Sequence, residues 1–209
     1  MIATVFSWFV VAMILLGAGA MLINRDWRIQ LGALALQYFA TFWLVTRHQP
    51  FIMGSAKLVT GWMVVAAIGM TRLSLTQSEH ENEPAPNFIP DNRWFSIALL
   101  AIMVLVTAGA TPRIEEIIPG LGLPVIAGGL LLITTGMIHL GITSDILRVI
   151  LSLLTILAGF DILYAAVESS ILVAGLLALT NLGLGLVGSY LLVAGSASTH
   201  ANFDEEQLL

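Results

Sequence analysis

The sequence predicts an all-α integral membrane protein with seven transmembrane helices. Of its 209 residues, 58% are hydrophobic and only 10% are charged, and the mean hydropathy is +0.95. A soluble domain carries roughly 25% charged residues, so this chain cannot cover itself with a hydrated surface. Its apolar runs are too long for barrel strands and lack their period-2 alternation. A helical bundle within a bilayer is the fold class that remains.

Each apolar run is about as long as a helix that crosses roughly 30 Å of hydrocarbon. In chain order the runs cover residues 2–23, 29–46, 51–71, 95–111, 120–141, 146–168 and 171–195. The first run has no basic segment before it, as a cleavable signal would, so we expect it to remain as a helix. Asp26 and Asp145 precede the second and sixth runs, where they fit helix N-caps or first-turn acids. Short turns make most consecutive helices antiparallel neighbours.

An internal similarity suggests how these runs are grouped. The stretches "INRDWRIQLGALALQYF" and "ITSDILRVILSLLTILAGF" both contain Ile, two polar residues, Asp, and then a helix with Arg28 or Arg148 in its first turn. Four spans separate the equivalent helices, so a duplication would be a parallel 3+1+3 repeat. The alternative is that no duplication occurred, because any two antiparallel helical hairpins resemble each other to some extent. We expect a first three-helix unit over residues 1–72, followed by a polar cytoplasmic loop over 73–94. A connector helix with its turn then covers 95–118, a second three-helix unit covers 119–195, and an acidic cytoplasmic tail covers 196–209.

The arginines set the expected orientation. With seven spans, Arg47 and Arg113 lie on the side of the N-terminus. The other side carries five arginines, at positions 25, 28, 72, 93 and 148. By the positive-inside rule the C-terminus is therefore cytoplasmic and the N-terminus is outside. The expected location is the inner (cytoplasmic) membrane of the cell, which the chain crosses several times.

Polar groups within a bilayer are costly and indicate function by default. In this sequence they are Lys57, His139, Asp161, Glu168 and Asn181. Lys57 lies about six residues, or roughly 9 Å, below the outer boundary, and Asp161 lies roughly 10 Å below the same boundary. The matching depths favour an ion pair within the bundle. Two alternatives remain open: Lys57 snorkels along its own stem while Asp161 is hydrated, or the charges serve a proton relay or a partner subunit.

The remaining polar residues have structural interpretations beside functional ones. Asp161 and Glu168 share a helix face, with Tyr164 between them, and carboxylates in line could carry protons. Glu168 nevertheless fits an interfacial position, and His139 fits a helix end near the headgroups. Asn181 is expected to hydrogen-bond across a helix interface. Nearby small residues, Gly183, Gly185 and Gly188, predict close helix packing within the chain or against another subunit.

The sequence offers no constellation for independent catalysis. The chain has no cysteine, which excludes disulfides, thiolate metal sites and iron–sulfur clusters. Its four histidines are scattered, and no nucleophile elbow, phosphate-binding loop or haem-ligating pair occurs. We therefore expect no cofactor and no metal, and at most a non-catalytic role in an oxidoreductase complex. Lipids and other integral membrane subunits are the expected partners, and nucleic acid is not.

Three stretches carry a resemblance to a known family. "SAKLVTGWMVV" is similar to a segment of hydrogenase-4 component E that bears a lysine early in its third span, and this relative has about the same length and seven-span layout. "SDILRVILSLL" looks like the corresponding turn and helix both of that component and of subunit K of bacterial complex I. "TNLGLGLVGSYLL" is similar to the family's glutamate-bearing last helix. The resemblance covers nearly the whole chain and implies a membrane-arm subunit of a respiratory, electron-transporting complex coupled to proton transport.

The chain also departs from that pattern. Leu154 stands where the family has an intramembrane glutamate in the sixth span, and Asn181 stands at the glutamate of the last helix. A residue that cannot ionise cannot relay a proton by titrating, so the resemblance favours placement in such an arm more than pumping by this chain. A purely structural subunit of another bioenergetic assembly is the main alternative. A stand-alone transporter is disfavoured, because no predicted span is broken by proline and intramembrane charge is sparse.

Overall fold

The structure, a computed structural model, describes residues 2–24, 26–78, 93–168 and 170–206, and within these ranges the only regular elements are seven α-helices. They are α1 (Ile2–Ile23), α2 (Trp27–Val45), α3 (Phe51–Ser78), α4 (Arg93–Ile117), α5 (Leu123–Ile142), α6 (Ile146–Val167) and α7 (Ile171–Glu206). The all-α fold class is confirmed. Arg25 and residues 79–92, which form most of the predicted cytoplasmic loop, lie outside the described residues.

Six of the seven helices are long and apolar enough to cross a membrane, and α2 is not among them. The apolar helices therefore indicate a membrane protein. The prediction of seven transmembrane spans is not established, because only six helices meet the requirement. α2 carries Arg28, Gln30 and Gln37, which lower its apolar content. Gln30 and Gln37 are nevertheless buried, because α2 packs against α1, α3, α5 and α6 in the interior of the bundle. Protein rather than lipid surrounds their side chains.

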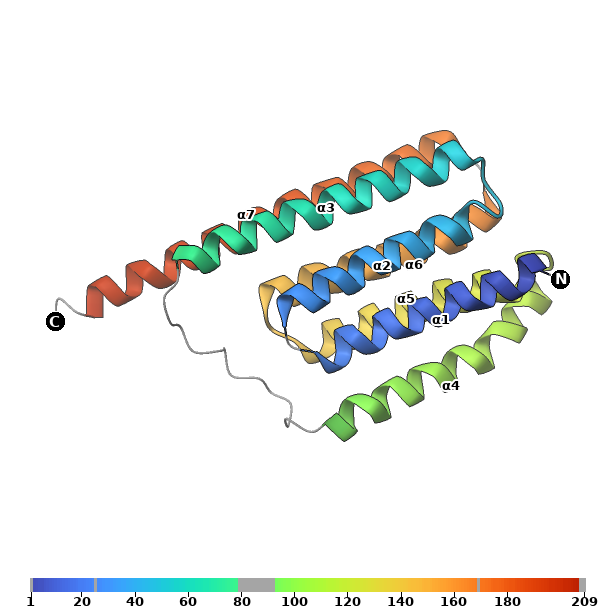
Figure 1. Cartoon of the computed structure of the whole chain (residues 1–209), viewed down its shortest axis with the longest axis horizontal. Helices are drawn as coiled ribbons and strands as arrows, with labels where there is room; N and C mark the ends of the chain where they lie inside the picture. The colour runs from blue at the N-terminus through green and yellow to red at the C-terminus, as the bar shows by residue number, and fades with distance from the viewer. Residues whose placement is uncertain (1, 25, 79–92, 169, 207–209) are drawn as a thin grey trace.

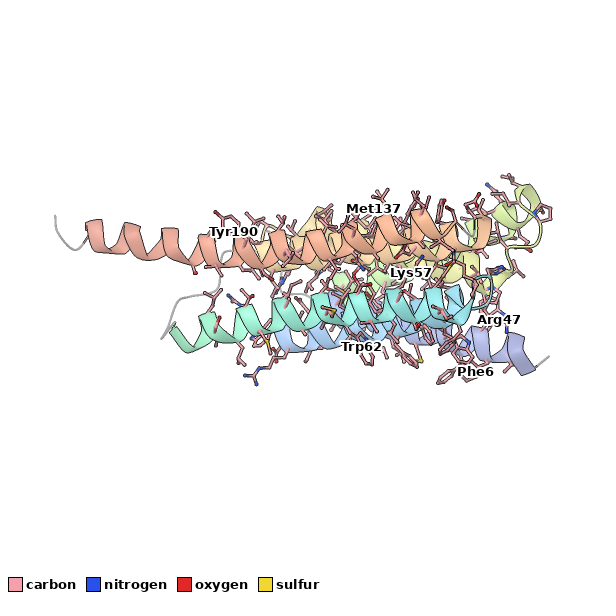
Figure 2. All side chains as sticks on the ribbon, turned by 90° about the horizontal axis from the view of Figure 1, so that it is seen from above. Phe6, Arg47, Lys57, Trp62, Met137 and Tyr190 are labelled. Atoms are coloured by element: carbon pink, nitrogen blue, oxygen red, sulfur yellow. The ribbon has the colours of Figure 1, made fainter. Side chains whose placement is uncertain are left out.

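The helices form two packed layers. One layer contains α1, α2 and α3, the other contains α5, α6 and α7, and each helix of the first layer packs on one of the second: α1 on α5, α2 on α6, and α3 on α7 (Figure 1). α4 lies against α1 and α5 at one edge, opposite the edge formed by α3 and α7. Trp62 and Met137 project from opposite outer faces, whereas Lys57 lies between the layers (Figure 2). The 3+1+3 parallel repeat stays a prediction.

Glycines allow the closest helix contacts. A Cβ on Gly159 of α6 would lie 2.7 Å from the carbonyl oxygen of Gly129 on α5, a separation that side chains essentially never show. In α7, Gly185 and Gly188 pack against Val64 and Ile150 in the same way. The predicted glycine packing is therefore confirmed at these two positions and occurs within the chain. A Cβ on Gly183 would have no neighbour within 4 Å among the described residues, so close packing of this glycine against another subunit stays a prediction.

Several helices run beyond the predicted apolar spans, because the hydrogen bonds of a helix join backbone groups and do not require apolar side chains. α3 extends to Ser78 and α7 to Glu206. α4 continues through Pro112 to Ile117, so this proline lies within a helix rather than beyond it. The predicted N-caps are confirmed. Asp26 and Asp145 accept hydrogen bonds from the amides of the second residues of α2 and α6 at 3.0 and 3.3 Å.

Candidate functional site

A buried ion pair joins the two layers. Lys57 Nζ on α3 lies 3.3 Å from Asp161 Oδ1 on α6, and the two side chains are only 5% and 4% exposed. The backbones of α3 and α6 do not pack directly, so the lysine stem reaches diagonally across the bundle. The pairing predicted from matching depths is confirmed, and Lys57 does not snorkel. Each charge makes the other tolerable, because an isolated charge in this apolar interior would be strongly disfavoured.

A second polar contact spans the other diagonal. The Tyr38 hydroxyl on α2 donates to Asn181 Oδ1 on α7 at 2.7 Å, and both residues are buried. α2, α3, α7 and α6 pack in sequence around a square, so the two diagonals meet within one four-helix interior. The prediction that Asn181 bonds across a helix interface is confirmed.

Gly61 makes room for this cluster. It lies one helical turn after Lys57 on α3, and a Cβ there would be 2.5 Å from the Tyr38 ring. The ring therefore occupies a notch that only glycine leaves open. With the ring seated against α3, its hydroxyl is directed towards α7. The glycine in "KLVTG" thus helps to position the tyrosine beside the lysine.

The polar interior continues between α2 and α6. Thr155 Oγ1 lies 3.2 Å from Gln37 Oε1 and also 2.8 Å from the carbonyl oxygen of Leu151, so its single proton is shared between two acceptors. Both Gln37 and Thr155 are fully buried. Gln37 Nε2 finds no hydrogen-bond partner among the described residues. An amide donor is thereby left unused in the middle of the bundle, one residue before Tyr38.

His139 lies in the last turn of α5, as predicted. It is 3% exposed, and its Nδ1 lies 2.9 Å from Ser152 Oγ on α6. The Ser152 hydroxyl donates to the carbonyl oxygen of Arg148 at 2.6 Å. Ser152 Oγ therefore lies within hydrogen-bond distance of both His139 Nδ1 and the Arg148 carbonyl oxygen, and the histidine tautomer decides which group donates between His139 and Ser152. α6 covers the imidazole, and a position near the headgroups stays a prediction.

Glu168 occupies the C-cap of α6 and is exposed, in agreement with an interfacial position. Its carbonyl oxygen accepts a hydrogen bond from Gln49 Nε2 at 3.1 Å, which ties the end of α6 to the turn before α3. Within the part of the chain that the structure describes, no contact links its carboxylate to Asp161. The carboxylates of Asp161 and Glu168 therefore do not form a direct contact through which a proton could pass along α6.

Sequence reasoning missed Tyr38, Gln37, Thr155 and Ser152. All four lie in apolar runs, where a single hydroxyl or amide is outweighed by its neighbours. One signal was available in the second run, where Gln37 and Tyr38 interrupt an otherwise apolar stretch. Among the described residues, no three His, Cys, Asp or Glu side chains lie close enough together to hold a metal ion.

Comparison with known proteins identifies no relative. No protein family, curated protein or solved structure matches the chain.

Proposed function

We propose that this chain is a membrane-arm subunit of a complex I-like or hydrogenase-like ion-translocating redox complex, in which Lys57 and Asp161 form part of an intramembrane charge network. The observation that carries the proposal is their ion pair, buried between the two helix layers and crossed by the Tyr38–Asn181 hydrogen bond. The resemblance of "SAKLVTGWMVV" to the lysine-bearing segment of hydrogenase-4 component E supports the same assignment.

Stability alone is a weak reason to bury such a pair. Well-packed apolar residues of similar volume commonly replace a buried ion pair without loss of stability, and sometimes with a gain. Ionisable side chains within transmembrane segments are rare, and they typically mark ion pathways. Lys57 and Asp161 therefore suit a task that needs charge. Electrostatic interactions reach further in a low-dielectric interior than in water with salt. The buried Lys57–Asp161 pair can therefore respond to a charge on another subunit at a distance at which an exposed pair would be screened.

The proposed role is electrostatic coupling. When a neighbouring subunit brings a positive charge near this cluster, the charge repels the Lys57 ammonium and attracts the Asp161 carboxylate. The four-carbon lysine stem can swing, whereas the aspartate is short and fixed on α6. Asn181 and Leu154 are neutral, so the chain would pass on a change of charge through the ion pair rather than through titrating glutamates. Asn181 would instead hold the Tyr38 hydroxyl beside the pair.

The proposed role requires a particular membrane topology and particular binding partners. We propose that α2 also crosses the bilayer, since it returns the chain from the end of α1 to the start of α3 (Figure 1). The N-terminus would lie outside and the C-terminus in the cytoplasm of a cell bounded by the inner membrane. Other integral membrane subunits and lipids would contact the apolar outer faces. Gentle extraction from native membranes should recover the chain in a larger assembly, and a pure monomer would count against the proposal.

The decisive experiment separates assembly from ion transport. The double variant Lys57→Met/Asp161→Leu removes both charges and leaves neither partner unpaired. We expect the host complex to assemble in normal amount and to lose most of its redox-driven ion transport. The matched control neutralises the more exposed pair of Asp145 and Arg148, 3.7 Å apart, with Asp145→Asn/Arg148→Gln, and should retain transport. Normal transport by the assembled Lys57/Asp161 variant would instead establish a purely structural subunit.

A further inference from the structure

A pocket of about 210 Å³ lies at the end of the bundle where α1 begins (Figure 1). Three segments that are far apart in the chain meet there. They contribute Ser7 of α1, Arg47 and His48 of the turn between α2 and α3, and Gly120 and Gly122 of the turn between α4 and α5. Sites for drug-sized molecules commonly measure roughly 300–1,000 Å³, so this pocket suits a smaller chemical group.

Two basic side chains in the wall have donors that the protein does not use. Arg47 and His48 follow the end of α2, and both are exposed at the end of the bundle (Figure 2). Their backbone amides donate to the carbonyl oxygens of Leu44 and Val45 at 3.3 and 3.0 Å, which holds the turn in place. Among the described residues, neither side chain makes an ion pair or a hydrogen bond. The guanidinium and imidazole N–H groups are therefore available to a ligand.

The wall formed by the turn between α4 and α5 supplies backbone donors. Gly120 and Gly122 have φ angles of 98° and 84°, which glycine adopts readily and other residues rarely adopt. Neither residue has a side chain that could cover its amide. Within the part of the chain that the structure describes, these two amides donate to no carbonyl or side chain. α5 begins at the next residue, Leu123, so the positive end of its helix dipole also lies at the pocket.

The charge of the pocket favours an anion. No acidic side chain lines it, although Glu115, Glu116 and Glu168 lie at the same end of the bundle. The positive charge comes from Arg47, and N–H donors come from both walls. An arginine guanidinium binds phosphate oxygens through two parallel hydrogen bonds, and amides at a helix N-terminus bind the same oxygens. A phosphate group therefore satisfies both walls at once.

The pocket also lies at the border of the apolar surface. Phe51, the first residue of α3, is 69% exposed, and Leu123, the first residue of α5, is 43% exposed. α3 and α5 are long and apolar enough to cross a membrane from these residues onwards. In a bilayer, the headgroup region with its phosphates flanks the hydrocarbon at that level. Both a phospholipid and phosphate dissolved in water can therefore reach the pocket.

We propose that this pocket binds a phosphate group, which Arg47 and His48 hold on one side and the amides of Gly120 and Gly122 hold on the other. The group belongs either to an anionic phospholipid, whose acyl chains then lie along the apolar surface, or to soluble phosphate. None of these residues belongs to the Lys57–Asp161 cluster. The inference therefore does not depend on the proposed ion-translocating role.

The test uses the full chain in a neutral detergent and three probes. Native mass spectrometry compares dioleoylphosphatidylglycerol with dioleoylglycerol, which lacks the phosphate, and calorimetry measures the binding of inorganic phosphate. Because Arg47 is exposed and its attraction to an anion is partly screened, we expect a lipid preference of roughly 3- to 10-fold. A lipid preference without binding of inorganic phosphate would identify the headgroup as the ligand, and the reverse would identify soluble phosphate. Equal affinities for the two lipids together with no binding of phosphate would overturn the proposal.

Three variants assign the effect to the pocket. Arg47→Gln removes an exposed charge and should abolish the binding preference for the phosphate-bearing probe. Arg47→Lys keeps the charge but loses the paired hydrogen bonds, and should retain only part of the preference. Arg113→Gln is the matched control, because Arg113 is exposed at the same end of the bundle and does not line the pocket, and it should retain the full preference. A preference that survives Arg47→Gln, or that Arg113→Gln lowers equally, would overturn the proposed site.

Discussion

Replacing Lys57 by methionine or Asp161 by leucine should destabilise the bundle strongly, whereas replacing both should not. The two charges lie 3.3 Å apart, and their side chains are 5% and 4% exposed, so either single change leaves an ion in low dielectric without its partner. Such a change commonly costs about 3–5 kcal/mol. The double variant removes both desolvated charges, and we expect its free energy of unfolding to lie within about 1 kcal/mol of the original chain, or above it.

The assay is a double-mutant cycle on the free energy of unfolding of the chain in bicelles, measured by steric trapping. The coupling between Lys57 and Asp161 should reach at least about 3 kcal/mol, because little of either single loss remains in the double variant. The reasoning fails if the two single losses simply add. Additive losses would mean that the residues do not interact, and that each is destabilising for a separate local reason.

Further predictions concern the second diagonal, the closest helix contact and the orientation. Tyr38→Phe leaves the buried Asn181 oxygen without its donor and should cost about 1–3 kcal/mol in the same unfolding assay, and adding Asn181→Leu should recover part of this loss. Gly159→Val forces a side chain into the backbone of α5 and should cost about 1–3 kcal/mol or more, whereas Gly141→Ala, where a Cβ meets nothing within 4 Å among the described residues, should change stability by less than about 1 kcal/mol. A cytoplasm-active reporter fused after Leu209 should be active, and the same reporter in the turn between α2 and α3 should be silent. The opposite pattern would reverse the orientation.

The ion pair was predictable because short turns fix where helices begin and end. Counting residues from those ends gave Lys57 and Asp161 the same depth. The Tyr38–Asn181 contact could have been predicted by the same counting from the helix ends, but uncharged residues such as these are less costly in a membrane and attract less notice. Tyr38 lies seven residues before Val45, and Asn181 lies ten residues after the start of α7. Their similar depth was therefore available, but a tyrosine within an apolar run does not by itself indicate a buried partner.

Other features depend on packing that one helix cannot indicate. His139 lies at a helix end, and only the position of α6 shows that Ser152 covers it. The status of α2 depends on its neighbours as well, because its glutamines are costly against lipid but acceptable inside a bundle. Gly159 is an ordinary small residue in sequence, and the approach of the α5 backbone is what makes it irreplaceable. These properties arise between segments far apart in the chain.

The distance along the chain between Lys57 and Asp161 has a consequence for biosynthesis. The two residues are 104 positions apart, so at about 5–20 residues per second the lysine is made roughly 5–20 s before its partner. During that interval α3 leaves the ribosome with an ammonium that no carboxylate of this chain yet neutralises. α3 is long and apolar enough to cross the bilayer, and a lysine near its N-terminal end can hold its ammonium at the lipid surface until α6 is made. Release of that ammonium from the interface would then be a late step, completed only when α6 has inserted.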